Sequence, residues 1–308
     1  MPNWTNILNE ISQAQLEKNF QQAQSPLDQI RRKYLSEFAK FRGRNVIAYY
    51  SGWLQRSSAE VGTSINDDDK NAFMSVINGM DRKRGLDLLL HTPGGGMSAT
   101  ESLIDYLHKM FNGDIEAFIP QIAMSAGTMI ACSCRQIYMG KQSSIGPIDP
   151  QFGGIPAYGV IKEFDDALAA IKKDPASIPL WQTIIGKYHP TFIGECRNAI
   201  MIANEIVEKY LGEVMFSGEK NAKKKIDRII NSLNEHNLEN KAHDRHISVE
   251  KAEEIGLKIE RFENDQKLQD AVLSVHHCYM HTFANSLAIK IVENGAGIAV
   301  ISSARAKG

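Results

Sequence analysis

Ser125 stands in the run AMSAGT at positions 123–128, between a predicted strand and a predicted helix. A serine on a strand-to-helix turn has the geometry of a nucleophile elbow, although Ala123 replaces the first glycine of the G-x-S-x-G pattern. The small neighbours would let a substrate backbone approach the hydroxyl closely. A helix that simply starts with small residues has the same pattern, so this segment alone leaves both interpretations open.

A second turn, PGGG at positions 93–96, lies between a buried apolar run and a helical pattern. Its glycines expose backbone N–H groups, and such groups at a helix start stabilise negative charge, either on a phosphate or on an oxyanion. A phosphate loop needs Lys-Ser or Lys-Thr after the glycines, whereas Met97-Ser98 follows here, and a dinucleotide fingerprint would need a third, correctly spaced glycine. A tight structural turn is the remaining alternative.

Together the two turns predict a single site. One βαβ unit separates them, so two parallel strands would bring both turns to the same carboxyl edge of a sheet, where open α/β folds bind ligands. We expect the amides of Gly95 and Ala126, with Gly94 beside them, to form an oxyanion hole for acyl transfer to Ser125.

The surrounding pattern predicts the elements that position this site. Strands are expected at 45–50, 86–90, 115–119 and 136–139, and helices at 66–80, 99–111 and 128–134. Strands alternating with helices predict an α/β fold with a parallel sheet. After Pro150 the pattern is mostly helical, ending in a helix over 266–293 and a Gly/Ala/Ser-rich tail that we expect to fray.

Four segments resemble motifs of the serine dehydrogenase proteinase (SDH) family of Clp-fold serine proteases, relatives of the ClpP peptidase and of signal peptide peptidase A: LLLHTPGGG, AMSAGTMIA, SSIGPIDPQ and AHDRHISVEKAEEIGL. The resemblance implies the ClpP/crotonase-like fold of repeated ββα units, assembled into homo-oligomers. It also implies a serine peptidase with a Ser-Asp-His triad, which falls on Ser125, Asp149 and His243. The expected organisation is a helical N-terminal arm (1–42), a Clp-fold serine protease domain (43–264) and a C-terminal helix with a flexible tail (265–308).

The serine hydroxyl needs a base, because it is a weak nucleophile at neutral pH. Histidine suits that task with an ordinary pKa of about 6.5, so His243 would take the proton and Asp149 would orient the imidazole. The alternative base is a lysine, as in signal peptide peptidase A. Lys162 is the candidate because an apolar run precedes it, and a catalytic lysine must be desolvated to lose its proton.

The bulk composition limits the partners and cofactors. With 35 basic and 36 acidic residues the net charge is -1, so no basic excess favours nucleic-acid binding. The four cysteines match no zinc spacing, and the His277/His281 pair lacks the glutamate of H-E-x-x-H, so we expect no metal or other cofactor. Neither a signal peptide nor a transmembrane segment is predicted, which favours a cytoplasmic location.

Three function classes stay open from these residues. The first is a peptidase that cleaves unfolded or short peptides inside an oligomer. The second is a crotonase-like acyl-CoA enzyme, because that fold also stabilises oxyanions with two backbone amides, although Ser125 and the Asp149/His243 pair disfavour it. The third is a non-catalytic oligomeric scaffold with the same fold.

Overall fold

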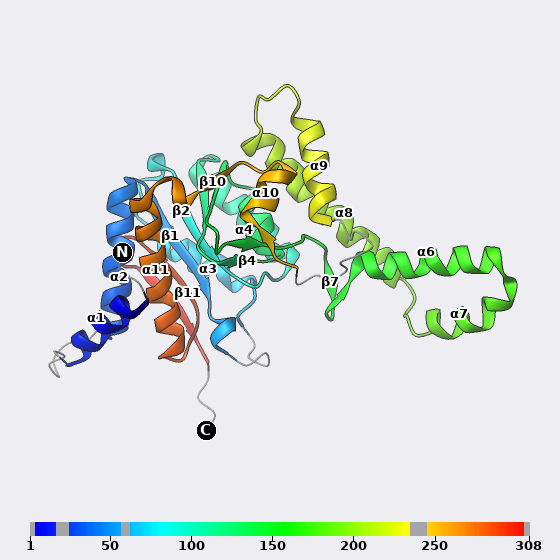
Figure 1. Cartoon of the computed structure of the whole chain (residues 1–308), viewed down its shortest axis with the longest axis horizontal. Coiled ribbons are helices and arrows are strands. Elements are labelled where there is room, and N and C mark those ends of the chain that lie inside the picture. Colours follow the sequence, from blue (N-terminus) through cyan, green and yellow to red (C-terminus); the bar gives the residue numbers. More distant parts are fainter. Residues whose placement is uncertain (1–3, 17–24, 57–61, 235–244, 305–308) are drawn as a thin grey trace.

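A seven-stranded sheet forms the centre of the computed structural model, which describes residues 4–16, 25–56, 62–234 and 245–304 (Figure 1). In spatial order its strands are β10 (Ile259–Arg261), β5 (Gln136–Met139), β3 (Ile115–Ile119), β2 (Leu86–His91), β1 (Asn45–Ser51), β11 (Ala288–Asn294) and β12 (Ala299–Ser303). In the described ranges, none of the helices has both the length and the apolar character that a membrane span requires.

The first five strands of that order are parallel, and β11 and β12 extend the sheet by antiparallel pairing. Strands β2 and β3 are buried at every position. Strands covered on both faces are expected to be continuously apolar, which explains the LDLLL and IEAFI runs. The predicted α/β fold with a parallel sheet is therefore confirmed.

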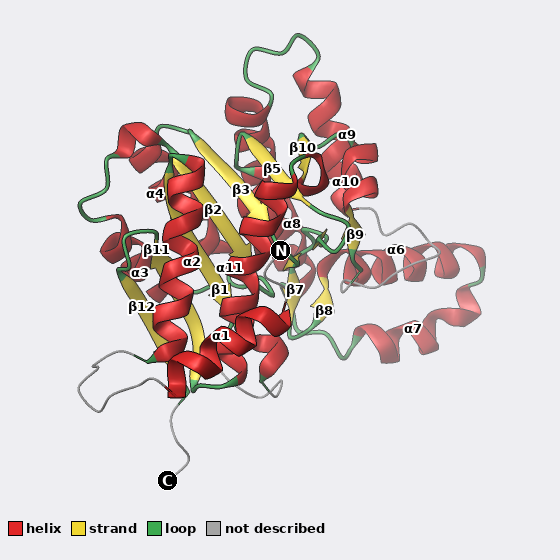
Figure 2. Ribbon diagram, turned by 60° about the vertical axis from the view of Figure 1, so that its left-hand side comes forward, coloured by secondary structure: helices red, strands yellow, loops and turns green. Residues whose placement is uncertain are grey.

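Helices cover both faces of the sheet, and alternate residues of β2 enter the two cores. Leu88 and Leu90 contact one core and Leu89 contacts the other. The first core is covered by α3 (Asp68–Ile77), α4 (Met97–Phe111) and α5 (Ala126–Cys132). Over the second core lie α2 (Pro26–Arg42) and α11 (Gln266–Ala284), side by side in Figure 2, with α1 (Trp4–Leu16) packed on them.

A second, smaller sheet leads the chain from β3 into α5. It consists of β4 (Ile122–Ala123), β6 (Ser144–Ile145) and β9 (Ile247–Ser248), in that order. β4 pairs with β6 in parallel, and β6 pairs with β9 antiparallel. Two-residue strands carry no sequence periodicity, so the sequence did not predict them. They place residues near position 247 in the same small sheet as β4, which leads to Ser125, with β6 between β4 and β9.

The segment after Pro150 forms a helical arm. A hairpin of β7 (Gln151–Phe152) and β8 (Ile155–Pro156) opens into α6 (Ala157–Lys173) and α7 (Ile178–Ile185), which project away from the sheet in Figure 1. The chain returns along α8 (Phe192–Tyr210), followed by α9 (Ala222–Asn234) and α10 (Val249–Ile255). α7 was not predicted, and none of its residues is buried although its sequence is IPLWQTII.

The C-terminal part differs from the expectation of one long helix and a frayed tail. α11 ends at Ala284, and Ala288–Asn294 forms β11, which is buried at every position and pairs with β1. β12 then pairs with β11 across a turn at Gly295–Ile298. The prediction is wrong here because the β-branched residues in AIKIVEN and AVISS favour strands, whose pairing with β1 and with each other ends the helix at Ala284.

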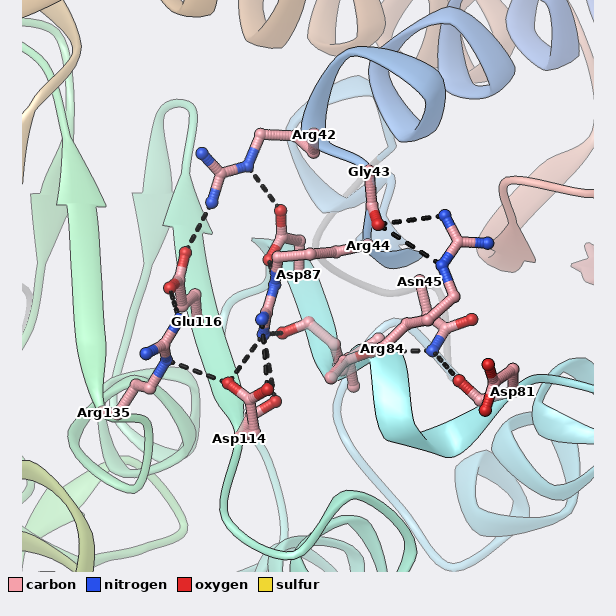
Figure 3. Close-up of polar contacts among 12 residues, drawn as sticks. Arg42, Gly43, Arg44, Asn45, Asp81, Arg84, Asp87, Asp114, Glu116 and Arg135 are labelled. Atoms are coloured by element: carbon pink, nitrogen blue, oxygen red, sulfur yellow. Dashed lines mark hydrogen bonds and ion pairs between the residues drawn. The ribbon is translucent and has the colours of Figure 1, made fainter.

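Ion pairs between arginines and carboxylates connect the amino ends of the parallel strands, as Figure 3 shows. Arg42 donates to Asp87 and to Glu116, both at 2.6 Å, and Arg44 donates to Asp87 at 2.6 Å. Arg44 and Arg135 also reach Asp114, each at 3.0 Å, and Arg135 pairs with Glu116. Burial opposes ionisation of Asp114, but its arginine partners outweigh that effect and lower its pKa. Three arginines and three carboxylates are thereby paired at this edge.

Candidate active site

Ser125 occupies a strained turn between β4 and α5. Its backbone has φ 50° and ψ −113°, a conformation that residues with a side chain rarely adopt. Hydrogen bonds fix both sides of the turn: Met124 N–H donates to Thr92 O at 3.0 Å, and Gly127 N–H donates to Met124 O at 2.8 Å. The half-exposed Ser125 side chain is thus presented at the carboxyl edge of the sheet. This geometry matches the predicted nucleophile elbow.

The glycine turn lies directly against this serine. Gly94 has φ +97°, and a Cβ added there would lie 2.8 Å from Met124 O and 2.9 Å from Ser125 Cβ. A Cβ on Gly95 would lie 2.3 Å from the backbone N and O of Ile65. Both glycines are therefore required by close backbone approach. The structure brings together the two turns that the sequence predicted to meet.

The backbone hydrogen bonds of the glycine turn determine which of its N–H groups can donate to a ligand. Ile65 N–H donates to Gly94 O at 2.8 Å, and Gly96 N–H donates to Ile65 O at 2.9 Å. In extended backbone, successive N–H groups point to opposite edges, so the Gly95 amide points away from Ile65. In the described part of the chain, neither the Gly95 amide nor the Ala126 amide has an acceptor.

The Gly94 amide is engaged, in contrast. It donates to Thr92 Oγ1 at 3.1 Å, which does not fit the expectation that Gly94 would lie in the oxyanion hole as a further donor. Gly94 contributes the shape of the turn, whereas Gly95 and Ala126 supply the candidate donors. Two free amides beside a serine hydroxyl are the arrangement that stabilises a tetrahedral oxyanion.

A pocket of about 460 Å³ opens beside Ser125. Its polar wall contains Ser125 and the glycine turn, and its apolar walls are formed by Met97, Met129, Ile148 and Phe152. The pocket is thus bounded by α4, α5 and the loop that leads to β7. An apolar cavity with a few convergent polar groups is the usual form of a ligand site.

Asp149 lies fully buried behind this pocket, between two lining residues, Ile148 and Pro150. Tyr158 N–H donates to its Oδ1 at 3.4 Å. Burial, together with the nearby Asp149 carboxylate, raises the pKa of the Cys196 thiol. The Asp149 carboxylate is thus adjacent to the pocket and has no exposed surface.

His243 lies outside the described residues, so its predicted role as the base is not tested by the structure. The chain is described again from Arg245, and His246 Nδ1 lies 2.7 Å from Ser144 Oγ. β9 follows immediately and joins the small sheet that leads to Ser125. His246 is not among the predicted site residues, and its place three residues after His243 in AHDRHIS is the signal that marks it.

Lys162, the alternative base, lies on α6 in the projecting arm. Its ammonium pairs with Asp166 at 2.5 Å, its side chain is 39% exposed, and it does not line the pocket of Ser125. A catalytic lysine needs a desolvated setting next to the nucleophile. The structure does not bring Lys162 and Ser125 together in this pocket.

His91 ends β2 but faces the opposite side of the sheet. It packs between Trp53 and His276, with ring centroids at 4.4 and 5.3 Å. Burial lowers its pKa to about 3, and within the described residues neither ring nitrogen has a hydrogen-bond partner. His91 is thus a neutral packing residue in this arrangement. Among the described side chains, no three that are suited to metal binding come together.

Comparison with known proteins finds one matching family and two relatives. A sequence profile of ClpP-like SDH-type serine proteinases matches residues 18–266. The uncharacterized protein MJ0137 of Methanocaldococcus jannaschii is 28% identical over 196 residues, which are 64% of this chain and 60% of that protein. The uncharacterized protein MJ1495 of the same organism is 30% identical over 136 residues, 44% of this chain and 46% of that protein. The chain thus matches less than two thirds of the length of either relative.

Proposed function

Because the chain belongs to the family of ClpP-like SDH-type serine proteinases, we propose that it hydrolyses peptide bonds through an acyl-enzyme on Ser125. The observation that carries this proposal is the strained Ser125 turn lying against two amides, of Gly95 and Ala126, that have no acceptor in the described residues. We propose unfolded or short peptides as substrates, since an extended backbone is needed to approach so closely packed a turn.

In the proposed reaction Ser125 Oγ attacks the carbonyl carbon of the scissile bond and gives its proton to a base. The carbonyl oxygen becomes an oxyanion that accepts hydrogen bonds from the Gly95 and Ala126 amides. The intermediate then expels the amine, which takes up the proton, and leaves an ester on Ser125. Water attacks this ester with the same base, releasing the acid and restoring the hydroxyl.

His243 is the proposed base and Asp149 its orienting carboxylate. Two observations support this assignment. Asp149 is buried next to the pocket, and β9, which begins four residues after His243, belongs to the same small sheet as β4, with β6 between the two strands. A Ser-Lys dyad with Lys162 has less support, because that lysine is exposed and paired with Asp166.

A fluorophosphonate probe, with the adduct located by mass spectrometry, tests this function. We expect labelling of Ser125 in the native protein and in Lys162→Ala, and its loss in Ser125→Ala and His243→Ala. Asp149→Asn should keep the fold while labelling falls by a factor of about 10⁴, since the imidazole would take the wrong tautomer. Labelling that needs Lys162 but not His243 would establish the dyad.

The other two function classes are outcomes of the same experiment. A protein whose Ser125 is never labelled is no serine hydrolase. Binding of acyl-CoA to such a protein, measured by calorimetry, would identify the crotonase-like alternative. A protein that is neither labelled at Ser125 nor able to bind acyl-CoA would fit the non-catalytic scaffold.

We also propose that the protein forms a homo-oligomer and acts in the cytoplasm. Exposed apolar side chains on the projecting arm support assembly, among them Leu168 at 59% and Leu180 at 62% exposure. The four cysteines are buried and unpaired, and free thiols are typical of a reducing compartment.

A further inference from the structure

A buried ion pair lies on the far side of the segment that supports the glycine turn. Lys290 of β11 donates to Asp69 of α3, with Nζ at 2.8 Å from Oδ1 and 3.0 Å from Oδ2. Both side chains are about 95% buried, with 4% and 5% exposure. Tyr49 O–H also donates to Asp69 Oδ2, at 2.8 Å. Buried charges are costly unless they are paired and hydrogen-bonded, as these are.

These groups hold residues 63–66, which form no helix or strand of their own. Lys290 Nζ donates to Ser64 O at 2.8 Å, and Asn66 N–H donates to Asp69 Oδ2 at 2.9 Å. Ser51 O–H, from the end of β1, donates to Thr63 O at 2.6 Å. The polar backbone groups on both sides of Ile65 are thereby fixed to α3, β1 and β11.

Ile65 is in turn the backbone partner of the glycine turn. It bonds to Gly94 O and Gly96 N–H, and its own backbone occupies the place where a Gly95 side chain would be. This pairing is what directs the Gly95 amide away from Ile65, toward the side where a peptide carbonyl would bind. A continuous chain of contacts thus runs from Lys290 to the oxyanion donor.

We infer that Lys290 and Asp69 are positioning residues of the oxyanion hole. They hold Ser64–Asn66 in place, and that segment sets the direction of the Gly95 N–H group. The inference rests on the proposed peptidase function for its kinetic consequence. Neither side chain lines the pocket of Ser125, so both act through the segment and not on the substrate.

The same strand offers a matched control. Glu293 of β11 is also fully buried and accepts from Arg31 Nε at 2.6 Å, from Arg32 Nε at 3.0 Å and from Tyr279 O–H at 2.9 Å. Its partners belong to α2 and α11, on the opposite face of the sheet from α3. Loss of this pair should weaken the fold in the same way as loss of the Lys290 pair, but without touching residues 63–66.

The experiment compares Lys290→Met with Glu293→Gln. For Lys290→Met we expect kcat on a peptide substrate to fall about 10- to 100-fold, with KM changed by less than about threefold, because a misdirected donor acts on the transition state. For Glu293→Gln we expect a lower melting temperature with kcat within about twofold of the native value. Hydrogen exchange of the peptide that contains Gly94–Gly96 should accelerate only in the Lys290 variant.

A second variant keeps the test decisive if Lys290→Met does not fold. The double substitution Lys290→Met with Asp69→Leu replaces the pair by apolar side chains, an exchange that often preserves stability. It should give a stable protein with the same loss of kcat and the same accelerated exchange.

Native kcat and unchanged exchange in the stable double variant would overturn the inference. The inference would also be overturned if Glu293→Gln lost as much kcat as Lys290→Met while the two variants had the same melting temperature. Absence of labelling at Ser125 in the native protein would instead remove the proposed function. The exchange measurement needs no activity and still decides whether Lys290 holds the turn.

Discussion

Ser125 and Gly95 form their site through backbone conformation more than through side chains. The positive φ of Ser125 costs about 1–3 kcal/mol, and it persists because the surrounding hydrogen bonds determine the turn. The sequence predicted that the two turns would meet, since strand order determines this. It could not predict which amide stays free, because the Ile65 and Thr92 contacts that engage Gly96 and Gly94 depend on tertiary packing.

The first residue-scale prediction concerns Gly95→Ala. The added Cβ would lie 2.3 Å from the Ile65 backbone, so the turn must shift and its amide must leave the oxyanion position. We expect kcat to fall about 100-fold or more. Steady-state hydrolysis of a peptide substrate measures this effect. Gly194→Ala, on α8 with open space around it, is the control and should keep native activity. Native kcat in Gly95→Ala would contradict the assignment.

The second residue-scale prediction concerns the substrate side chain that precedes the cleaved bond. The pocket beside Ser125 is walled by Met97, Met129, Ile148 and Phe152. Burying a leucine-sized side chain there contributes about 1.5–3 kcal/mol, so kcat/KM should favour leucine or methionine over alanine about 10- to 100-fold. A peptide library with one varied position measures the preference. A preference for charged residues at that position would show that this cavity is not the specificity pocket.

At the scale of elements, long apolar strands and helices could be predicted, whereas short ones could not. β2 and β3 match their predicted ranges closely, because each is a continuous run of mostly apolar residues. The strands β4, β6 and β9 have two residues each, and only their pairing defines them. The Ser125 turn is held by these short strands. The sequence therefore predicted the residues of the candidate site better than the strand pairing that positions them.

The packing of β2 against α11 gives a prediction about pH. His91 and His276 face each other with Tyr50 and Trp53 around them. Burial lowers the pKa of His91 to about 3 and that of His276 well below its ordinary value, which the neighbouring His91 and His277 lower further. Below about pH 6.5 the unfolded chain binds protons that the folded chain excludes. For each histidine, stability should therefore fall by up to about 1.4 kcal/mol per pH unit as the pH decreases below 6.5, and for His91 this loss continues to about pH 3.

Urea denaturation between about pH 6.5 and 4.5 measures this slope. In His91→Phe the slope should decrease by the equivalent of about one proton. An unaltered slope in His91→Phe would mean that His91 does not contribute to the pH dependence.

At the scale of the whole molecule, the amino and carboxyl edges of the parallel strands differ in their side chains. The amino edge is closed by alternating arginines and carboxylates, as Figure 3 shows, whereas the carboxyl edge carries the Ser125 pocket. The arm of α6 and α7 begins beside that pocket and extends away from it. α7 has no buried residue within the chain, so its apolar surface is available to another molecule.

Assembly through this arm is the prediction at this scale. Leu168→Asp combined with Leu180→Asp should reduce the oligomer to smaller species, because charges in an apolar interface are costly. Light scattering coupled to size-exclusion chromatography measures the mass. Met74→Asp, at a similarly exposed apolar position on α3, serves as the control and should keep the native mass. A native protein that is monomeric would contradict the proposed assembly.

The position of β11 has a consequence for the order of synthesis. β1 lies between β2 and β11 in the sheet, yet residues 288–294 are translated more than 230 residues after residues 45–51. One edge of β1 therefore stays open on the ribosome until almost all of the described chain has emerged, and Lys290 emerges with that last partner. Ser125, the proposed nucleophile, is therefore synthesised early, whereas Lys290, which we infer to position the Gly95 amide, is synthesised late. A nascent chain would thus lack the ordered Gly95 turn until β11 has been synthesised and has paired with β1.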